Sequence, residues 1–289
     1  MGSSGQVGWE LNRGLLPYGV VKACDKDNLD LLNESEIRGA VREFKPNVII
    51  NAAAYTAVDR AETDRETCRA LNVTAPGVMA EEAEKRGAWM VHYSSDYVFN
   101  GRNTRPWTED DEPDPINYYG QSKLEGDLAI MRNSSRYLIF RTSWVYASRG
   151  SNFLLTMLRL FANKNEVRVV NDQIGAPTWA RYLAQATLLS LKQAMNNDDA
   201  GLSGVYNLVA SGSTSWYDFA REIKEYAGGF DVSVNPISSA EYPVPAPRPE
   251  WSVLSLEKIE RVFGVYAAPW RDAARLCIDE IKERQPLDE

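Results

Sequence analysis

Short runs of β-branched and aromatic residues alternate with longer amphipathic stretches over most of the chain. Continuous or alternating apolar runs predict strands, and apolar positions three or four residues apart predict helices. Alternation of the two is typical of a parallel sheet covered on both faces, so we expect a doubly wound α/β fold. The predicted strands are 19–25, 47–53, 88–94, 137–144, 166–171 and 205–210, and the predicted helices are 35–44, 70–85, 117–132, 152–161 and 178–195.

The alternation loosens after about residue 150. Helices are predicted at 216–226, 256–263 and 270–284, and the proline-rich stretch 242–249 between them must be extended or turning. We interpret this part as a smaller C-terminal substrate lobe. The expected division is a nucleotide-binding domain at 1–150, with 172–210 packing back onto it, and a lobe made of 151–171 and 211–289.

The chain opens with three glycines at Gly2, Gly5 and Gly8, followed by a possible helix at 7–13. Such a run permits a tight turn and close approach of a pyrophosphate to the free amides of a helix start. Asp25 follows Gly8 by an interval suited to an acid that binds a ribose hydroxyl. The adjacent Lys26 could partly neutralise the charge of a 2′-phosphate. These features predict a Rossmann-type site for NADH or NADPH.

The strand that should precede these glycines is absent, because only Met1 stands before Gly2. Three explanations stay open. The start could be artificial or misassigned, the chain could be truncated, or the glycines could form a leader without a phosphate role. The codons upstream of Met1 would separate the first explanation from the second.

Composition excludes several classes of function. The formal net charge of −8 argues against nucleic acid and anionic membranes as partners. The three cysteines, Cys24, Cys68 and Cys277, lie too far apart to suggest disulfides or a structural zinc site, so we expect no metal and a reducing cytoplasm. No apolar run approaches the length of a membrane span, and no signal segment opens the chain.

Tyr119 and Lys123 lie four residues apart in a predicted helix, which puts a phenol and an ammonium on one face. A nearby cation can lower the pKa of a phenol, so that it gives a proton to a substrate. Ser95 ends a predicted strand and could orient a carbonyl oxygen. Together they suit ketone reduction by a nicotinamide, whereas the single histidine, His92, is expected to be a packed core residue.

Longer blocks around these residues resemble the extended short-chain dehydrogenases, and among them the dTDP-4-dehydrorhamnose reductase family. The likeness covers almost the whole chain and consists of several blocks in order, which is more specific than any one motif. The resemblance implies reduction of the 4-keto group of a dTDP-6-deoxy-L-hexulose by NADH or NADPH in the cytoplasm, and a possible homodimer. The blocks are 5–11, 51–59, 93–99, 119–124, 141–146, 171–178 and 248–249, followed by Ser252.

The resemblance also assigns roles residue by residue. Tyr119 would be the proton donor, Lys123 its partner and a cofactor ligand, and Ser95 the hydroxyl that is often threonine in relatives. Asp96 and Trp144 would face the dTDP-sugar together with Ser95 and Tyr119, and Arg248, flanked by prolines, could clamp the diphosphate. The implied cofactor-binding set is Gly2, Gly5, Gln6, Val7, Asp25, Ala53, Ala54, Thr56, Tyr119 and Lys123.

Two other functions stay open on the same scaffold. One is a non-catalytic NAD(P)-binding regulatory subunit, similar to the beta subunit of methionine adenosyltransferase. The other is a nucleotide-sugar epimerase or dehydratase. Retention of Ser95, Tyr119 and Lys123 favours an enzyme over a binding subunit, and the block at 93–99 matches the reductases better than the epimerases.

Overall fold

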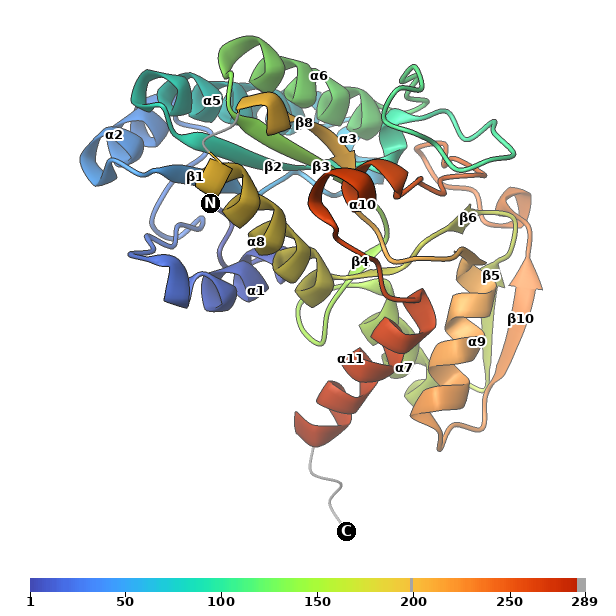
Figure 1. Ribbon diagram of the computed structural model, residues 1–289. Coiled ribbons are helices and arrows are strands. Elements are labelled where there is room, and N and C mark those ends of the chain that lie inside the picture. The colour runs from blue at the N-terminus through green and yellow to red at the C-terminus, as the bar shows by residue number, and fades with distance from the viewer. Residues whose placement is uncertain (198–199, 285–289) are drawn as a thin grey trace.

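The computed structural model describes residues 1–197 and 200–284. Its central sheet is parallel and has the strand order β1-β2-β3-β8 (Figure 1). The register pairs Ile49 with Met90 and Ser95 with Thr142, so the carboxyl ends of neighbouring strands lie together. The strands are β1 (Val48–Asn51), β2 (Trp89–Ser95), β3 (Tyr137–Thr142) and β8 (Gly204–Asn207).

Helices cover both faces of this sheet, which confirms the doubly wound fold (Figure 1). One face carries α2 (Glu34–Phe44), α5 (Ala75–Arg86) and α6 (Tyr118–Asn133), and the other carries α1 (Gln6–Gly14), α8 (Ala180–Asn197) and α10 (Glu257–Phe263). Both faces of the strands are therefore buried in apolar side chains. Short helices α3 (Val58–Ala61) and α4 (Arg65–Arg69) and a π-helical turn at Ala70–Thr74 precede α5.

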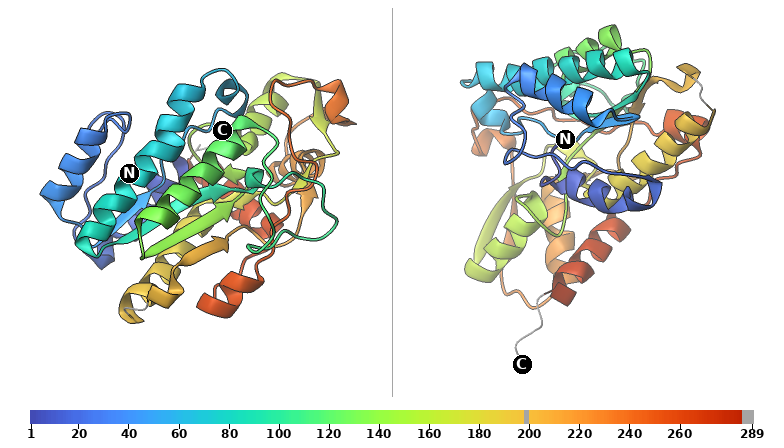
Figure 2. Two further views of the ribbon diagram at one scale, coloured as in Figure 1. Left: turned by 90° about the horizontal axis from the view of Figure 1, so that it is seen from above. Right: turned by 90° about the vertical axis from the view of Figure 1, so that its left-hand side faces the viewer.

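A separate apolar cluster lies beside the sheet and joins α7 (Phe153–Asn163), α9 (Trp216–Ala227) and α11 (Trp270–Arg284) (Figures 1 and 2). The predicted strand at 166–171 belongs here and not to the main sheet, because β5 (Glu166–Val170) pairs with β10 (Ser233–Ile237). Two small ladders connect the parts, namely β4 (Val145–Tyr146) with β7 (Thr178–Trp179) and β6 (Ile174–Gly175) with β9 (Thr214–Ser215).

The strand predicted at 19–25 is wrong, because this segment forms no strand. A strand requires a ladder of backbone bonds, and among the described residues the one ladder bond to it runs from Ser3 N–H to Cys24 C=O (3.0 Å). On the other side, Met1 bonds to β1: its ammonium donates to Ile50 C=O (2.7 Å), and its carbonyl accepts from Ala52 N–H (3.1 Å). Met1 to Ser3 thus sits between the segment and β1.

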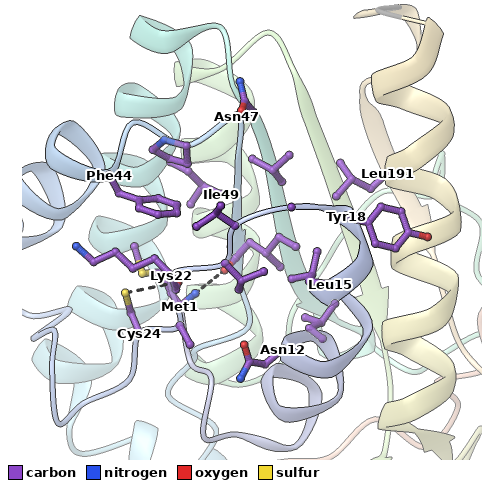
Figure 3. A pocket seen from close by; sticks show the side chains of 18 of the residues that line it. Met1, Asn12, Leu15, Tyr18, Lys22, Cys24, Phe44, Asn47, Ile49 and Leu191 are labelled. Atoms are coloured by element: carbon purple, nitrogen blue, oxygen red, sulfur yellow. Dashed lines mark hydrogen bonds between the residues drawn. The ribbon is translucent and has the colours of Figure 1, made fainter.

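Ahead of Met1, the space between 19–25 and β1 is a groove of about 740 Å³ (Figure 3). Apolar side chains from α1, α2 and α8 close it on two faces. The apolar lining includes Leu11, Leu15, Val41, Phe44, Leu188 and Leu191.

Among the described residues, no helix combines the length and the apolar character that crossing a membrane would require.

Candidate active site

A cavity of about 630 Å³ opens at the carboxyl edge of the sheet, where ligands bind in open parallel folds. Its walls come from α1, the end of β1, the start of α6 and the loop after β4. All ten residues that the sequence assigned to the cofactor line it: Gly2, Gly5, Gln6, Val7, Asp25, Ala53, Ala54, Thr56, Tyr119 and Lys123. The fold therefore brings together four segments that are far apart in the sequence.

The glycine run forms a close backbone turn at one end of the cavity. Gly2 has φ +76°, and a Cβ there would lie 2.7 Å from the backbone nitrogen of Ala53. No described residue accepts a hydrogen bond from the backbone N–H of Gln6 or Val7 in the first turn of α1, and no side chain caps this helix. Free amides at a helix start attract a phosphate, so this end fits the pyrophosphate of a dinucleotide.

Asp25 lines the cavity beside Lys26, on the far side of the glycine turn. Its carboxylate accepts hydrogen bonds from the backbone N–H of Asp27 (3.1 Å) and from the Ser3 hydroxyl (3.5 Å). A carboxylate suits a ribose 2′-hydroxyl, and the ammonium of Lys26 suits a 2′-phosphate. The two side chains together fit the adenosine end of either nicotinamide cofactor.

Three contacts fix the start of α6, which carries Tyr119 and Lys123. Asn117 caps the helix, because its side-chain oxygen accepts the backbone N–H of Gly120 (2.8 Å). Gly120 touches the loop after β2, since a Cβ there would lie 2.1 Å from the carbonyl oxygen of Tyr97. Asn72, in the π-helical turn, donates to Ser122 Oγ (2.9 Å). The helix is therefore held rigidly against the strand that ends at Ser95.

Ser95 and Tyr119 meet at this point. The Ser95 hydroxyl lies near enough to the Tyr119 phenol to lower its pKa. It also accepts the backbone N–H of Tyr97 (3.1 Å) and donates to Asp96 Oδ1 (3.0 Å). Burial raises the pKa of Tyr119, although Ser95 opposes the shift. The phenol therefore stays protonated, as a proton donor must before it reacts.

Lys123 lies deeper than the sequence suggested and does not pair with Tyr119. Its side chain is 1% exposed, and Nζ lies 3.0 Å from Nε2 of His92. Burial lowers the pKa of Lys123 to about 8, with opposing contributions from Asp127 and Cys68. The lysine nitrogen is turned towards the histidine, and the effect of Lys123 on the pKa of the phenol stays a prediction.

Of the five residues expected to bind the dTDP-sugar, Tyr119 alone lines this cavity. Ser95, Asp96, Trp144 and Arg248 lie outside the cavity lining. Trp144 has φ +48° and stacks on Trp216, with ring centres 3.5 Å apart. Arg248 forms a salt bridge with Asp59 (2.8 Å) and so already has an anionic partner.

Sequence reasoning missed three polar residues at the site. His92 is fully buried as expected, but it bonds to Lys123 instead of serving as a plain core side chain, and Asn51 bonds to His92. Arg149 lines the cavity near the glycine turn, and its buried Nη1 has no hydrogen-bond partner in the described part of the chain. Asn51 inside an apolar strand was a signal that could have been followed, because buried amides need polar partners. Nothing around Arg149 in the sequence marked it.

Known proteins with similar sequences point to one family. The family described as the RmlD substrate binding domain matches residues 1–283. A dTDP-4-dehydrorhamnose reductase from Burkholderia thailandensis is 44% identical, over 97% of each chain, and one from Escherichia coli K12 is 42% identical, over 97% of this chain and 96% of the other. The chain belongs to the dTDP-4-dehydrorhamnose reductase family.

Solved structures agree with membership of the reductase family. A dTDP-4-dehydrorhamnose reductase from Clostridium acetobutylicum superposes with a TM-score of 0.91 at 36% identity, covering 97% of this chain and 98% of the other. A dTDP-4-dehydrorhamnose reductase from Bacillus anthracis, solved in complex with NADP, superposes with a TM-score of 0.88 at 35% identity, covering 96% of this chain and 97% of the other. A UDP-glucose 4-epimerase from Thermus thermophilus, with a TM-score of 0.76 at 19% identity, shares the fold alone.

Proposed function

We propose that this chain reduces the 4-keto group of dTDP-4-dehydro-6-deoxy-L-mannose, with NADPH or NADH as the hydride source, to give dTDP-L-rhamnose. The observation that carries the proposal is the presence of Tyr119 and Lys123 in the lining of the cavity that the glycine turn closes, in a chain of the reductase family. The influence of Ser95 on the pKa of Tyr119 supports a proton donor with an orienting hydroxyl beside it.

When bound, the reduced nicotinamide supplies the hydride that attacks the carbonyl carbon. The chain's own residues supply position and the proton. Ser95 orients the carbonyl oxygen, and the Tyr119 phenol gives its proton to that oxygen as negative charge develops. A phenol with a raised pKa still does this, because the alkoxide formed by ketone reduction is a much stronger base than a phenolate.

The glycine turn and the free amides of Gln6 and Val7 would hold the diphosphate of the cofactor. Asp25 and Lys26 would contact the adenosine ribose, and Ala53, Ala54 and Thr56 would line the nicotinamide side. Small side chains there let a flat ring approach the backbone closely. This assignment rests on the shared cavity lining of these residues.

Residues 151–171 and 211–289 are proposed as the substrate lobe, with Asp96, Trp144 and Arg248 turned to the sugar nucleotide when it binds. The Trp144–Trp216 stack offers a flat apolar wall for a sugar or base. Arg248 would have to exchange Asp59 for the substrate diphosphate. A cytoplasmic location and a homodimer complete the proposal, and the homodimer is checked by sedimentation.

The test is oxidation of NADPH or NADH by the purified full-length chain, followed by loss of nicotinamide absorbance. We expect turnover when a dTDP-4-keto-6-deoxy sugar is added and none without it. Tyr119→Phe should lose turnover on the order of 100-fold while it keeps cofactor affinity. A folded, cofactor-saturated protein without turnover would refute the proposal and favour a regulatory NAD(P)-binding role.

A further inference from the structure

Gln6 and Asn152 bond to each other at the edge of the cofactor cavity, although they are 146 positions apart in the sequence. Asn152 Nδ2 donates to Gln6 Oε1 across 2.8 Å. Gln6 is the first residue of α1 and lines the cavity, whereas Asn152 stands directly before α7. The contact therefore joins the helix beside the glycine turn to a helix of the apolar cluster beside the sheet.

Backbone groups decide which way the Asn152 amide points. Its Oδ1 accepts the backbone N–H of Leu155 (3.0 Å) and so caps α7. Its Nδ2 lies 2.9 Å from the carbonyl oxygen of Ala147 and 3.2 Å from that of Arg149. A backbone N–H can only donate and a backbone carbonyl can only accept, so the oxygen and the NH₂ of Asn152 cannot exchange places.

The NH₂ of Asn152 in turn fixes the Gln6 amide. It faces an acceptor, so the Gln6 oxygen points to Asn152 and the Gln6 NH₂ points the other way. Within residues 1–197 and 200–284, no group accepts a hydrogen bond from Gln6 Nε2. The NH₂ of a half-buried side chain in the cavity lining is therefore free for a ligand that accepts hydrogen bonds.

The loop before Asn152 is shaped around the Gln6 side chain. Gly150 has φ +77°, and a Cβ there would lie 3.4 Å from Gln6 Cγ. Arg149, Gly150 and Ser151 line the same cavity. The loop ends on α7, which is anchored by buried apolar side chains. Asn152 is therefore a fixed support for the Gln6 amide.

A glutamine amide without such a support can turn either its oxygen or its NH₂ towards a ligand. Phosphate oxygens accept hydrogen bonds, so they are attracted to the NH₂ and repelled by the amide oxygen. We propose that Asn152 is a positioning residue for cofactor binding, which holds the NH₂ of Gln6 towards the diphosphate of NADPH or NADH. A preorganised donor costs less conformational entropy when the ligand binds.

The inference rests on the proposed function for the place of the cofactor diphosphate, but its test reads binding and does not depend on turnover. A protein that binds NADPH through this contact without turnover would refute the proposed function and leave the role of Asn152 standing.

The first test compares the Kd for NADPH in full-length variants. Asn152→Ser keeps an oxygen that caps α7 but removes the NH₂, and we expect it to raise the Kd by about 10-fold. Asn33→Ser is the matched control. Asn33 caps α2 by accepting the backbone N–H of Ser35 (3.1 Å) and lies outside the cavity lining, so the Kd should not change in that variant.

Gln6→Met separates the Gln6 contact from a general loosening of the loop. It removes the amide and keeps the length of the side chain. In the Gln6→Met background, Asn152→Ser should raise the Kd by less than about 2-fold, because the group through which Asn152 acts is gone. The same loss of affinity in both backgrounds would overturn the proposal, since Asn152 would then act through the loop alone.

Adenosine 2′-monophosphate tests whether the diphosphate is the group concerned, because it has the ribose phosphate of NADPH but no diphosphate. Its Kd, measured by NMR titration, should be the same in the unaltered chain and in Asn152→Ser. An equal loss of affinity for both ligands would indicate a distorted cavity and would also overturn the proposal.

Asn152→Asp is the second variant. Aspartate caps α7 but offers Gln6 only acceptors, so the Gln6 amide should turn over and direct its oxygen to the diphosphate. We expect the Kd for NADPH to rise by about 100-fold, and by about 10-fold less in the Gln6→Met background. If Asn152→Ser does not fold, Asn152→Asp takes its place, and equal losses in the two backgrounds refute the proposal.

If neither variant folds, the side-chain NH₂ signals of Gln6 in the unaltered protein decide. They are identified by ¹⁵N NMR as the signals that Gln6→Met lacks. NADPH should shift them and adenosine 2′-monophosphate should not. Signals that NADPH leaves unshifted would overturn the proposal.

Discussion

The Ser95 hydroxyl donates its one proton to Asp96 Oδ1 across 3.0 Å. It cannot donate to a substrate oxygen at the same time. Burial raises the pKa of Asp96 to about 7, and Ser252 and Ser95 oppose the shift. The charge state of Asp96 therefore controls where the Ser95 proton points.

Turnover should rise as pH falls through about 7. A protonated Asp96 can donate to Ser95, which releases the Ser95 proton for the ketone. We expect the plot of kcat/KM against pH to show a limb with an apparent pKa near 7, because kcat/KM reports groups of the free protein and the pKa of Asp96 there is about 7. This limb should be absent in Asp96→Asn. If it persists in that variant, the titrating group is not Asp96.

Stability should depend on the same carboxyl. A folded pKa raised above the unfolded value means that the native state binds more protons between pH 4 and 7, so Asp96 destabilises the fold progressively as pH rises through that window. Asp96→Asn should therefore gain stability relative to the unaltered chain between pH 4 and 8, by roughly 2–4 kcal/mol. Urea unfolding of both proteins at pH 4 and at pH 8 measures the two free energies of unfolding. The same difference in free energy at both pH values would contradict the prediction.

Arg149 should contribute to cofactor affinity. It lines the cavity beside the glycine turn with an unpartnered Nη1, so a diphosphate could accept a charged hydrogen bond from it. Arg149→Met should raise the Kd for NADPH by about 10- to 100-fold. Arg13→Met is the matched control, because Arg13 stacks on the same Trp9 ring as Arg149 but lies outside the cavity lining. An equal rise in the Kd for NADPH in both variants would show that the loss comes from the stack on Trp9 and not from a contact with the diphosphate.

Gly175 should be required for the position of Trp144. A Cβ at Gly175 would lie 2.6 Å from the Trp144 ring and 2.9 Å from Ser252 Oγ. Gly175→Ala should destabilise the protein by about 1–3 kcal/mol and raise KM for the dTDP-sugar, with cofactor Kd unchanged. In Gly39→Ala the new methyl group meets open space on α2, so this control should be neutral or stabilising. An unchanged KM in Gly175→Ala would show that Trp144 does not contact the substrate.

Much of the architecture could be read from local pattern. The strands at β1, β2, β3 and β8 and the helices that cover them follow from apolar runs and helical spacing, which depend on neighbouring residues alone. The segment 19–25 shows the limit of this reasoning. Its residues have the composition of a strand, but a strand needs a bonded neighbour, and within the described ranges Ser3 alone provides one.

The candidate site divides in the same way. The sequence by itself determined which residue types stand at the ends of strands and at the start of α6, and so the proton donor, the hydroxyl and the glycine turn could be named. Only the tertiary structure decided what each group bonds to. Lys123 faces His92 and not Tyr119, Ser95 faces Asp96, and Arg248 faces Asp59. Hydrogen bonds and pKa values depend on burial and on partners distant in sequence, and those are set only when the chain has folded.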